Sequence, residues 1–99
     1  MNLLQETLGV LEDEGIVPRL DVLYVMTGDS WGTWDDFTKL ANIDYDAGFG
    51  SQEINSSLCI VGKDWWLERS EYDGAEGWEY KSLPNRPIIY NPNLNLKES

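Results

Sequence analysis

The reactive side chains of this sequence are overwhelmingly carboxylates. Its 99 residues hold 18 Asp and Glu against seven Lys and Arg, a formal net charge of −11, and they include no histidine. Histidine is the commonest metal ligand and a frequent general base. Its absence excludes Ser-His-Asp and Cys-His nucleophilic sites. Carboxylate pairs suit glycosidase-like chemistry or a divalent metal, but they are too abundant here to mark one site.

Two short patterns have the form of known sites, and both fail on a required residue. Gly28-Asp29-Ser30 is similar to the start of an esterase motif, but it has no histidine partner and is better interpreted as a strand-to-helix turn. Asp44-Tyr45-Asp46 begins like a calcium loop, yet Phe49 stands where glycine is needed and Asn55 where glutamate is needed. We therefore predict no catalytic residue, no metal site and no cofactor, and thus no enzyme.

Cys59 is the only cysteine, so an internal disulfide is impossible. It lies within the apolar run Leu58–Val61, which predicts a buried, unpaired thiol that acts as a small hydrophobe. The chain shows no signal-like start and no apolar stretch of membrane-spanning length. We expect a cytoplasmic protein with no membrane partner.

Two helices are predicted in the first half. Asn2 is placed to cap the first, in which Leu4, Leu8 and Leu11 form one apolar stripe before Gly15 ends it. Residues 20–26 then read as a central strand buried on both faces.

The second helix begins at a capping box. Thr33 is followed at the third position by Asp36, and the helix should end near Asn42. One side of it carries its apolar residues, which are Trp34, Phe37, Leu40 and Ala41.

Residues 54–83 predict a three-stranded antiparallel meander. Its second turn has two possible lengths. A two-residue Asp73-Gly74 turn sets Glu68 opposite Glu79, whereas a four-residue loop sets Glu68 opposite Lys81, and electrostatics favours the loop. Both lengths give the same faces. Trp65, Leu67, Arg69 and Glu71 share one face with Trp78 and Tyr80, while Trp66, Glu68 and Tyr72 share the other with Glu79, Lys81 and Leu83.

The predicted fold is a single α+β domain over residues 1–83. Two helices pack on a small, mostly antiparallel sheet, and residues 84–99 form an extended tail in which Ile88–Tyr90 would add an edge strand. Residues 81–99 carry three bases and one acid, so we expect this tail to lie along the acidic body.

Charge and aromatic content together predict a binding function. The charge disfavours direct binding of nucleic acid or an anionic membrane and favours a basic protein, above all one that binds nucleic acid. Trp66 or Tyr72 would anchor the contact, because Trp and Tyr dominate binding hot spots. The predicted partner-binding residues are Glu12, Asp13, Glu14, Trp66, Glu68, Glu71, Tyr72, Asp73, Glu76 and Glu79.

The segment Trp65–Tyr80 resembles one found in small, functionally unassigned proteins encoded by bacteriophages. The resemblance implies a phage setting, in which small acidic proteins often inhibit host defence or DNA-handling enzymes, some of them as DNA mimics. The 18 carboxylates are similar in number to the ~18 phosphates along 30 Å of duplex. An immunity or antitoxin-like protein against one basic toxin, and a structural or accessory phage protein, remain alternatives.

Overall fold

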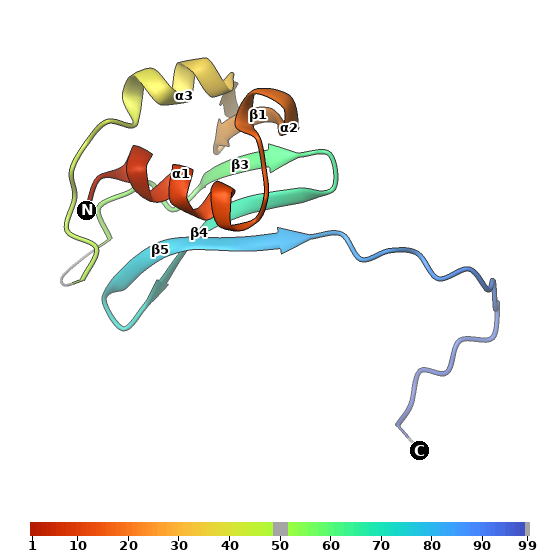
Figure 1. The fold of residues 1–99 in the computed structure, drawn as a ribbon. Helices are drawn as coiled ribbons and strands as arrows, with labels where there is room; N and C mark the ends of the chain where they lie inside the picture. Colours follow the sequence, from red (N-terminus) through yellow and green to blue (C-terminus); the bar gives the residue numbers. More distant parts are fainter. Residues whose placement is uncertain (49–51, 99) are drawn as a thin grey trace.

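The computed structural model describes residues 1–48 and 52–98. Its centre is a five-stranded sheet in the order β2-β1-β3-β4-β5, with every neighbouring pair antiparallel (Figure 1). The strands are β1 (Val22–Thr27), β2 (Ser30–Gly32), β3 (Leu58–Gly62), β4 (Trp65–Tyr72) and β5 (Ala75–Ser82). The predicted α+β class is therefore confirmed, and the predicted meander is β3-β4-β5.

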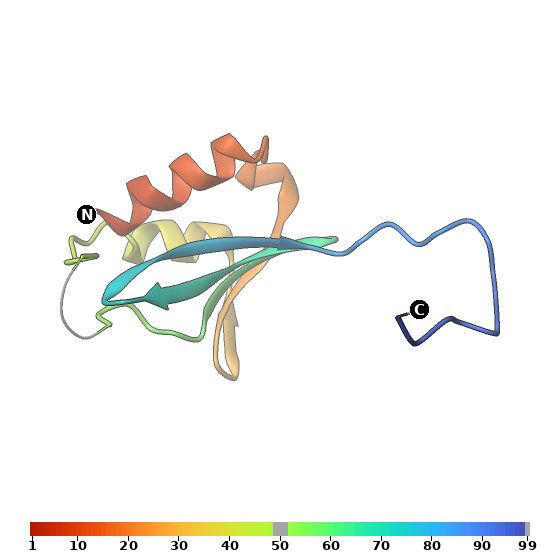
Figure 2. The ribbon, with the colours of Figure 1, turned by 90° about the horizontal axis from the view of Figure 1, so that it is seen from below.

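The two longer helices cover a single face of this sheet. They are α1 (Leu3–Asp13) and α3 (Trp34–Leu40), and Figure 2 shows both on the same side of the strands. A short helix that the sequence analysis did not predict, α2 (Pro18–Asp21), leads into β1. The apolar core lies between the helices and the sheet; among its members are Leu3, Leu11, Val25, Phe37, Ile60 and Leu67. Among residues 1–48 and 52–98, no helix covers the opposite face of the sheet (Figure 2).

Both predicted helix starts are confirmed. The Asn2 side chain accepts from the Gln5 backbone N–H at 3.0 Å, and Thr33 and Asp36 form a reciprocal capping box. The predicted buried stripe of α1 is confirmed at Leu11 and wrong at Leu8, because the structure buries Leu3, Thr7 and Leu11, leaves Leu4 partly buried and leaves Leu8 exposed. Thr7 can be buried because its hydroxyl donates to the Leu3 carbonyl at 2.7 Å, which satisfies a polar group away from water.

The first strand differs from its prediction in two ways. β1 lies next to the edge strand β2, and only one of its faces is covered, so Val25 is buried while Tyr24 and Met26 on the other face are only partly buried. Leu23, which is 61% exposed, lies where the register between β1 and β3 shifts. The segment 27–30 is a hairpin turn, not a strand-to-helix turn, because Thr27 pairs with Ser30. Gly28 has φ +56° there, a conformation that glycine adopts without strain.

The turn between β4 and β5 has two residues, so the four-residue prediction is wrong. Asp73 and Gly74 have φ +53° and +85°, as a type I′ hairpin turn requires, and Glu68 lies opposite Glu79. Lys81 relieves this repulsion from the diagonal position, with its Nζ 2.6 Å from Glu68 Oε1. The predicted sharing of faces is confirmed, since it did not depend on turn length.

Residues 83–98 contain no helix or strand and extend away from the domain (Figures 1 and 2). The tail therefore does not lie along the acidic body, and Ile88–Tyr90 does not form the predicted edge strand. Within the described chain, no helix is long and apolar enough to cross a membrane.

Candidate protein-binding face of the sheet

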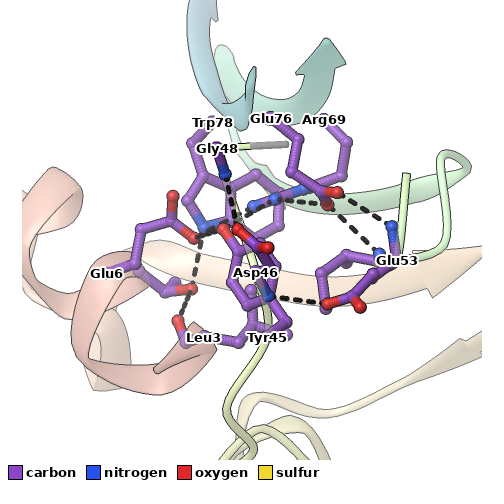
Figure 3. A network of polar contacts seen from close by, with 11 residues as sticks. Leu3, Glu6, Tyr45, Asp46, Gly48, Glu53, Arg69, Glu76 and Trp78 are labelled. Carbon is purple, nitrogen blue, oxygen red and sulfur yellow. Dashed lines mark hydrogen bonds and ion pairs between the residues drawn. The ribbon is translucent and has the colours of Figure 1, made fainter. Parts of the chain in front are cut away.

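The two faces of the sheet carry very different polar groups. On the covered face, Arg69 of β4 is the centre of a buried cluster with Glu6, Tyr45, Glu76 and Trp78 (Figure 3). Its guanidinium lies 3.2 Å from a carboxylate oxygen of Glu6 and 3.2 Å from one of Glu76. It also donates to the Tyr45 hydroxyl at 3.0 Å and lies 4.7 Å from the centre of the Trp78 ring. We call these five residues the Arg69 cluster.

The Arg69 cluster ties separate segments together through its carboxylates. Glu76 accepts from the backbone N–H groups of Glu53 and Ile54, at 2.8 and 3.1 Å. Tyr45 donates to Glu6 at 2.6 Å; burial and this hydrogen bond raise the pKa of the Tyr45 hydroxyl. The cluster thus joins α1, the segment before β3 and the β4-β5 hairpin.

The chemistry of the Arg69 cluster is directed inward. Within it, the only buried side-chain N or O atom without a hydrogen-bond partner in the described structure is Arg69 Nε. Trp78 likewise donates to the Thr7 hydroxyl at 2.9 Å. Within residues 1–48 and 52–98, no three Cys, Asp or Glu side chains gather as a metal-binding group. We interpret the cluster as structural.

On the other face, the strand pairing sets side chains in two adjacent rows. We call this surface the open face. The first row runs across the sheet from Trp31 through Met26, Cys59 and Glu68 to Glu79, and the second from Tyr24 through Val61 and Trp66 to Lys81. The rows are apolar and aromatic over β2, β1 and β3, and over β4 and β5 they are charged except at Trp66. Trp31 is 72% exposed.

A hollow of about 500 Å³ lies at the apolar end of the open face. It is bordered by Tyr24, Met26 and Trp31, with Asp29 of the β1-β2 turn at its margin. Aromatic walls beside a carboxylate can hold the stem of a Lys or Arg side chain while the carboxylate meets its charge. The hollow therefore suits a basic side chain of a protein partner.

The charged end of the open face is organised around Glu68. Its carboxylate accepts from Lys81 at 2.6 Å and from the Trp66 indole at 3.3 Å. The hydrogen bond from Lys81 lowers the pKa of Glu68, and Glu68 in turn raises the pKa of Lys81. Glu68 and Lys81 thus remain charged at neutral pH, and Trp66 is held by its ring nitrogen.

Cys59 is free and half-buried in the middle of the first row. Its thiol is thus unpaired, as predicted, but less buried than predicted. Burial and the neighbouring Glu68 charge raise the pKa of the thiol, so it is protonated and weakly reactive at neutral pH. As the single cysteine of the chain, Cys59 offers a unique position for chemical labelling at the centre of the open face.

The structure divides the ten predicted partner-binding residues among several places. Four share the open face: Trp66, Glu68, Tyr72 and Glu79. Glu12, Asp13 and Glu14 are exposed on the helix layer, on the other side of the sheet. The remaining three lie at or near the β4-β5 turn, namely Glu71, Asp73 and Glu76.

Two of the predicted acids are used by the hairpin itself. Glu71 accepts from the Gly74 backbone N–H at 2.6 Å and so supports the turn. Glu76 differs most from its prediction, because its side chain is only 2% exposed and its carboxylate is already paired with Arg69 and hydrogen-bonded to backbone N–H groups. From the sequence, an acidic residue on an edge strand is expected to be exposed to solvent. Glu76 is buried only because the segment before β3 packs over β5.

Half of the carboxylates serve the fold in this way. Nine of the 18 accept a hydrogen bond within the described residues: Glu6, Asp21, Asp36, Asp44, Asp46, Glu53, Glu68, Glu71 and Glu76. The other nine accept none from described residues: Glu12, Asp13, Glu14, Asp29, Asp35, Asp64, Asp73, Glu79 and Glu98. Three of these nine, Asp29, Asp64 and Asp73, stand one in each hairpin turn of the sheet. The free charge is therefore concentrated at turns and helix ends.

The sequence analysis missed the apolar part of the open face. Trp31, Tyr24 and Met26 lie in segments read as a turn and as a doubly buried strand. The sequence did offer one signal: Trp31 is a large aromatic residue next to Gly32 in a short polar segment, and a segment of this kind is not expected to be buried.

Comparison with protein-family models, with curated proteins and with solved structures finds no match.

Proposed function

We propose that this protein is a non-enzymatic binding protein whose open face occupies a basic surface of a nucleic-acid-handling protein and blocks it. The observation that carries the proposal is the uncovered sheet face, which carries Trp31 and Tyr24 at one end and Trp66 beside Glu68 and Glu79 at the other. A phage-encoded inhibitor acting in the cytoplasm is the setting we propose for it. The free thiol of Cys59 suits such a reducing compartment.

Electrostatics supports a basic partner. A net charge of −11 attracts positively charged surfaces over about 10 Å at moderate ionic strength, and this raises association rates. Extended basic surfaces are typical of proteins that bind nucleic acid. The free carboxylates of the hairpin turns border the open face, so they would meet the basic rim of such a surface while the aromatic residues contact its centre.

The dimensions of the open face are adequate for a specific contact. Five strands at ~4.8 Å spacing and about six residues long form a face of roughly 24 by 20 Å. This is of the same order as the ~800 Å² of accessible surface that a standard interface buries on each partner. Aromatic residues ringed by charge are the usual hot spots of such interfaces.

The experiment is capture with the tagged full chain followed by binding kinetics on the captured protein. Trp31→Ala and Trp66→Ala should each weaken binding at least tenfold, because each removes an aromatic anchor from the open face. Leu20→Ala is the matched control, since Leu20 is 80% exposed on α2, away from the open face. The captured protein should also lose nucleic-acid binding when this chain is added.

A charge variant tests the steering separately. Asp29→Lys, Asp64→Lys and Glu79→Lys together should slow association and flatten its salt dependence, without loss of folding, since none of these carboxylates accepts a hydrogen bond from a described residue and none of the three residues has a positive φ. Glu71 and Glu76 are avoided because they support the hairpin. Capture of only neutral or acidic proteins, or binding that is indifferent to salt, would contradict the proposal.

A further inference from the structure

The tail carries large apolar side chains that the rest of the chain does not cover. Ile88, Ile89 and Tyr90 are 102%, 84% and 87% exposed in the extended segment after β5. Arg86 precedes Ile88 by two residues, so in an extended chain both side chains point to the same side. A run of this kind, apolar with one positive charge, is suited to lie in an apolar groove with acidic residues at its margin.

The helix-covered side of the domain provides such a groove along α3. Two hollows, of about 310 and 300 Å³, lie side by side and share Thr27, Phe37, Leu40 and Leu58. The first is closed by further apolar residues, including Ile43 and Ile54, and has Glu53 at its margin, while Asp36 lines the second. We call this feature the α3 groove. Leu40 is 76% and Ile43 48% exposed, so its rim is apolar and open.

We propose that the α3 groove binds the Ile88–Tyr90 segment of a second copy of this chain, so that two copies exchange tails and form a dimer. The two apolar surfaces cover each other, and Arg86 brings positive charge to Asp36 and Glu53. The second hollow is also lined by Met26 and Trp31, so an exchanged tail would reach the β2 end of the open face. The inference does not rest on the proposed function, because the dimer is tested by variants that leave Trp31 and Trp66 unchanged.

The length of the tail favours a second copy over the same molecule. Ile88 is five residues beyond Leu83, so it lies at most ~18 Å from it. Leu83 follows β5 at the end of the sheet that holds the β3-β4 turn, and it donates to the Asp64 carbonyl at 2.7 Å. Leu58 lies at the other end, ~17 Å along the strands and ~10 Å across them. The straight line of ~20 Å exceeds the reach of Ile88, and α1, which packs over β4 and β5 through Glu6 and Thr7, obstructs it, so Ile88 cannot reach Leu58 of its own groove.

Sedimentation velocity over a hundredfold range of protein concentration tests the proposal. The full chain should shift from monomer to dimer, whereas Ile88→Asp/Ile89→Asp and Leu40→Asp should each remain monomeric throughout. These positions are exposed in the monomer, so their folding is preserved and circular dichroism can confirm it. Leu20→Asp, at an equally exposed leucine away from the groove and the tail, should dimerise like the wild type.

Mixing the two monomeric variants gives the sharpest result. The Leu40→Asp chain keeps an intact tail and the Ile88→Asp/Ile89→Asp chain keeps an intact groove, so their mixture should recover a dimer that neither forms alone. A full chain that stays monomeric at every concentration would overturn the proposal and leave the tail to a different protein or to its own domain. A dimer that survives either variant would also overturn it, because the contact would then lie elsewhere.

Discussion

The two faces of the sheet carry the same residue types in opposite environments, buried on one face and exposed on the other. On the covered face, Trp78 and Glu76 are joined to Arg69, and every carboxylate there is held by the fold. On the open face, Trp66 and Glu79 come from the same two strands, β4 and β5, and their side chains point to the opposite side of the sheet. Whether an aromatic residue and a neighbouring acid are built into the core or left on the surface therefore depends on which side of the sheet the helices cover.

The difference also changes how the net charge is understood. A count of 18 carboxylates suggests a uniformly acidic surface, whereas half of them accept hydrogen bonds that cap helices, close turns or hold Arg69. The other half accept no hydrogen bond from a described residue. Mimicry of DNA would thus depend on far fewer carboxylates than the composition indicates. A contact anchored by the aromatic residues of the open face requires fewer free carboxylates than mimicry does.

The largest effect should come from Arg69→Met. The substitution keeps an apolar side chain but leaves Glu6 and Glu76 buried without their cation, so we expect a loss of about 3–5 kcal/mol in the free energy of unfolding, measured by urea denaturation. The triple variant with Glu6→Gln and Glu76→Gln should recover part of this loss, because it removes the buried charges. A loss below about 1 kcal/mol for Arg69→Met would show that the Arg69 cluster does not hold the fold.

A matched pair on β5 compares the faces directly. Glu76→Gln should cost about 1–3 kcal/mol, because its carboxylate bonds Arg69 and two backbone N–H groups in a buried site. Glu79→Gln, on the open face of the same strand, should change the free energy of unfolding by no more than about 0.5 kcal/mol. Equal effects in the same denaturation experiment would abolish the distinction between the two faces.

The smallest effect concerns reactivity alone. Glu68→Gln removes one of the two causes that raise the pKa of Cys59, so the pH profile of alkylation by iodoacetamide should move to lower pH while stability changes little. Burial, the larger cause, remains, so the shift is partial. Asp73→Asn, at the distant turn, is the control and should leave the profile unchanged. An unchanged profile in Glu68→Gln would place Cys59 away from Glu68 and contradict the order of the rows.

Local signals in the sequence were reliable wherever geometry within a few residues decides the outcome. Asn2 and Thr33 begin their helices as predicted, because an N-cap needs only a side-chain oxygen beside free N–H groups. The turn at Asp73-Gly74 shows the limit of such reasoning. A repulsive Glu68–Glu79 pair argued against it, but the preference of Asp-Gly for positive φ prevailed, and Lys81 relieved the repulsion diagonally.

The errors arose where burial depends on distant segments. Thr7 reads as polar, yet it lies at the core because Leu3 and Trp78 bond its hydroxyl. The apolar run of β1 reads as doubly buried, yet an apolar strand is equally compatible with one exposed face. No pattern within these segments indicates which distant residues will pack against them.

The sequence by itself determined the charge, the absence of histidine, the single thiol and the alternation of side chains along β4 and β5. These follow from composition and from the two-residue period of a strand, which no packing can alter. Only the tertiary structure decided that α1 and α3 cover the same face, and so which set of aromatics and acids is buried and which is free. The physical reason is that alternation is local, whereas burial is a long-range property set by where the helices pack.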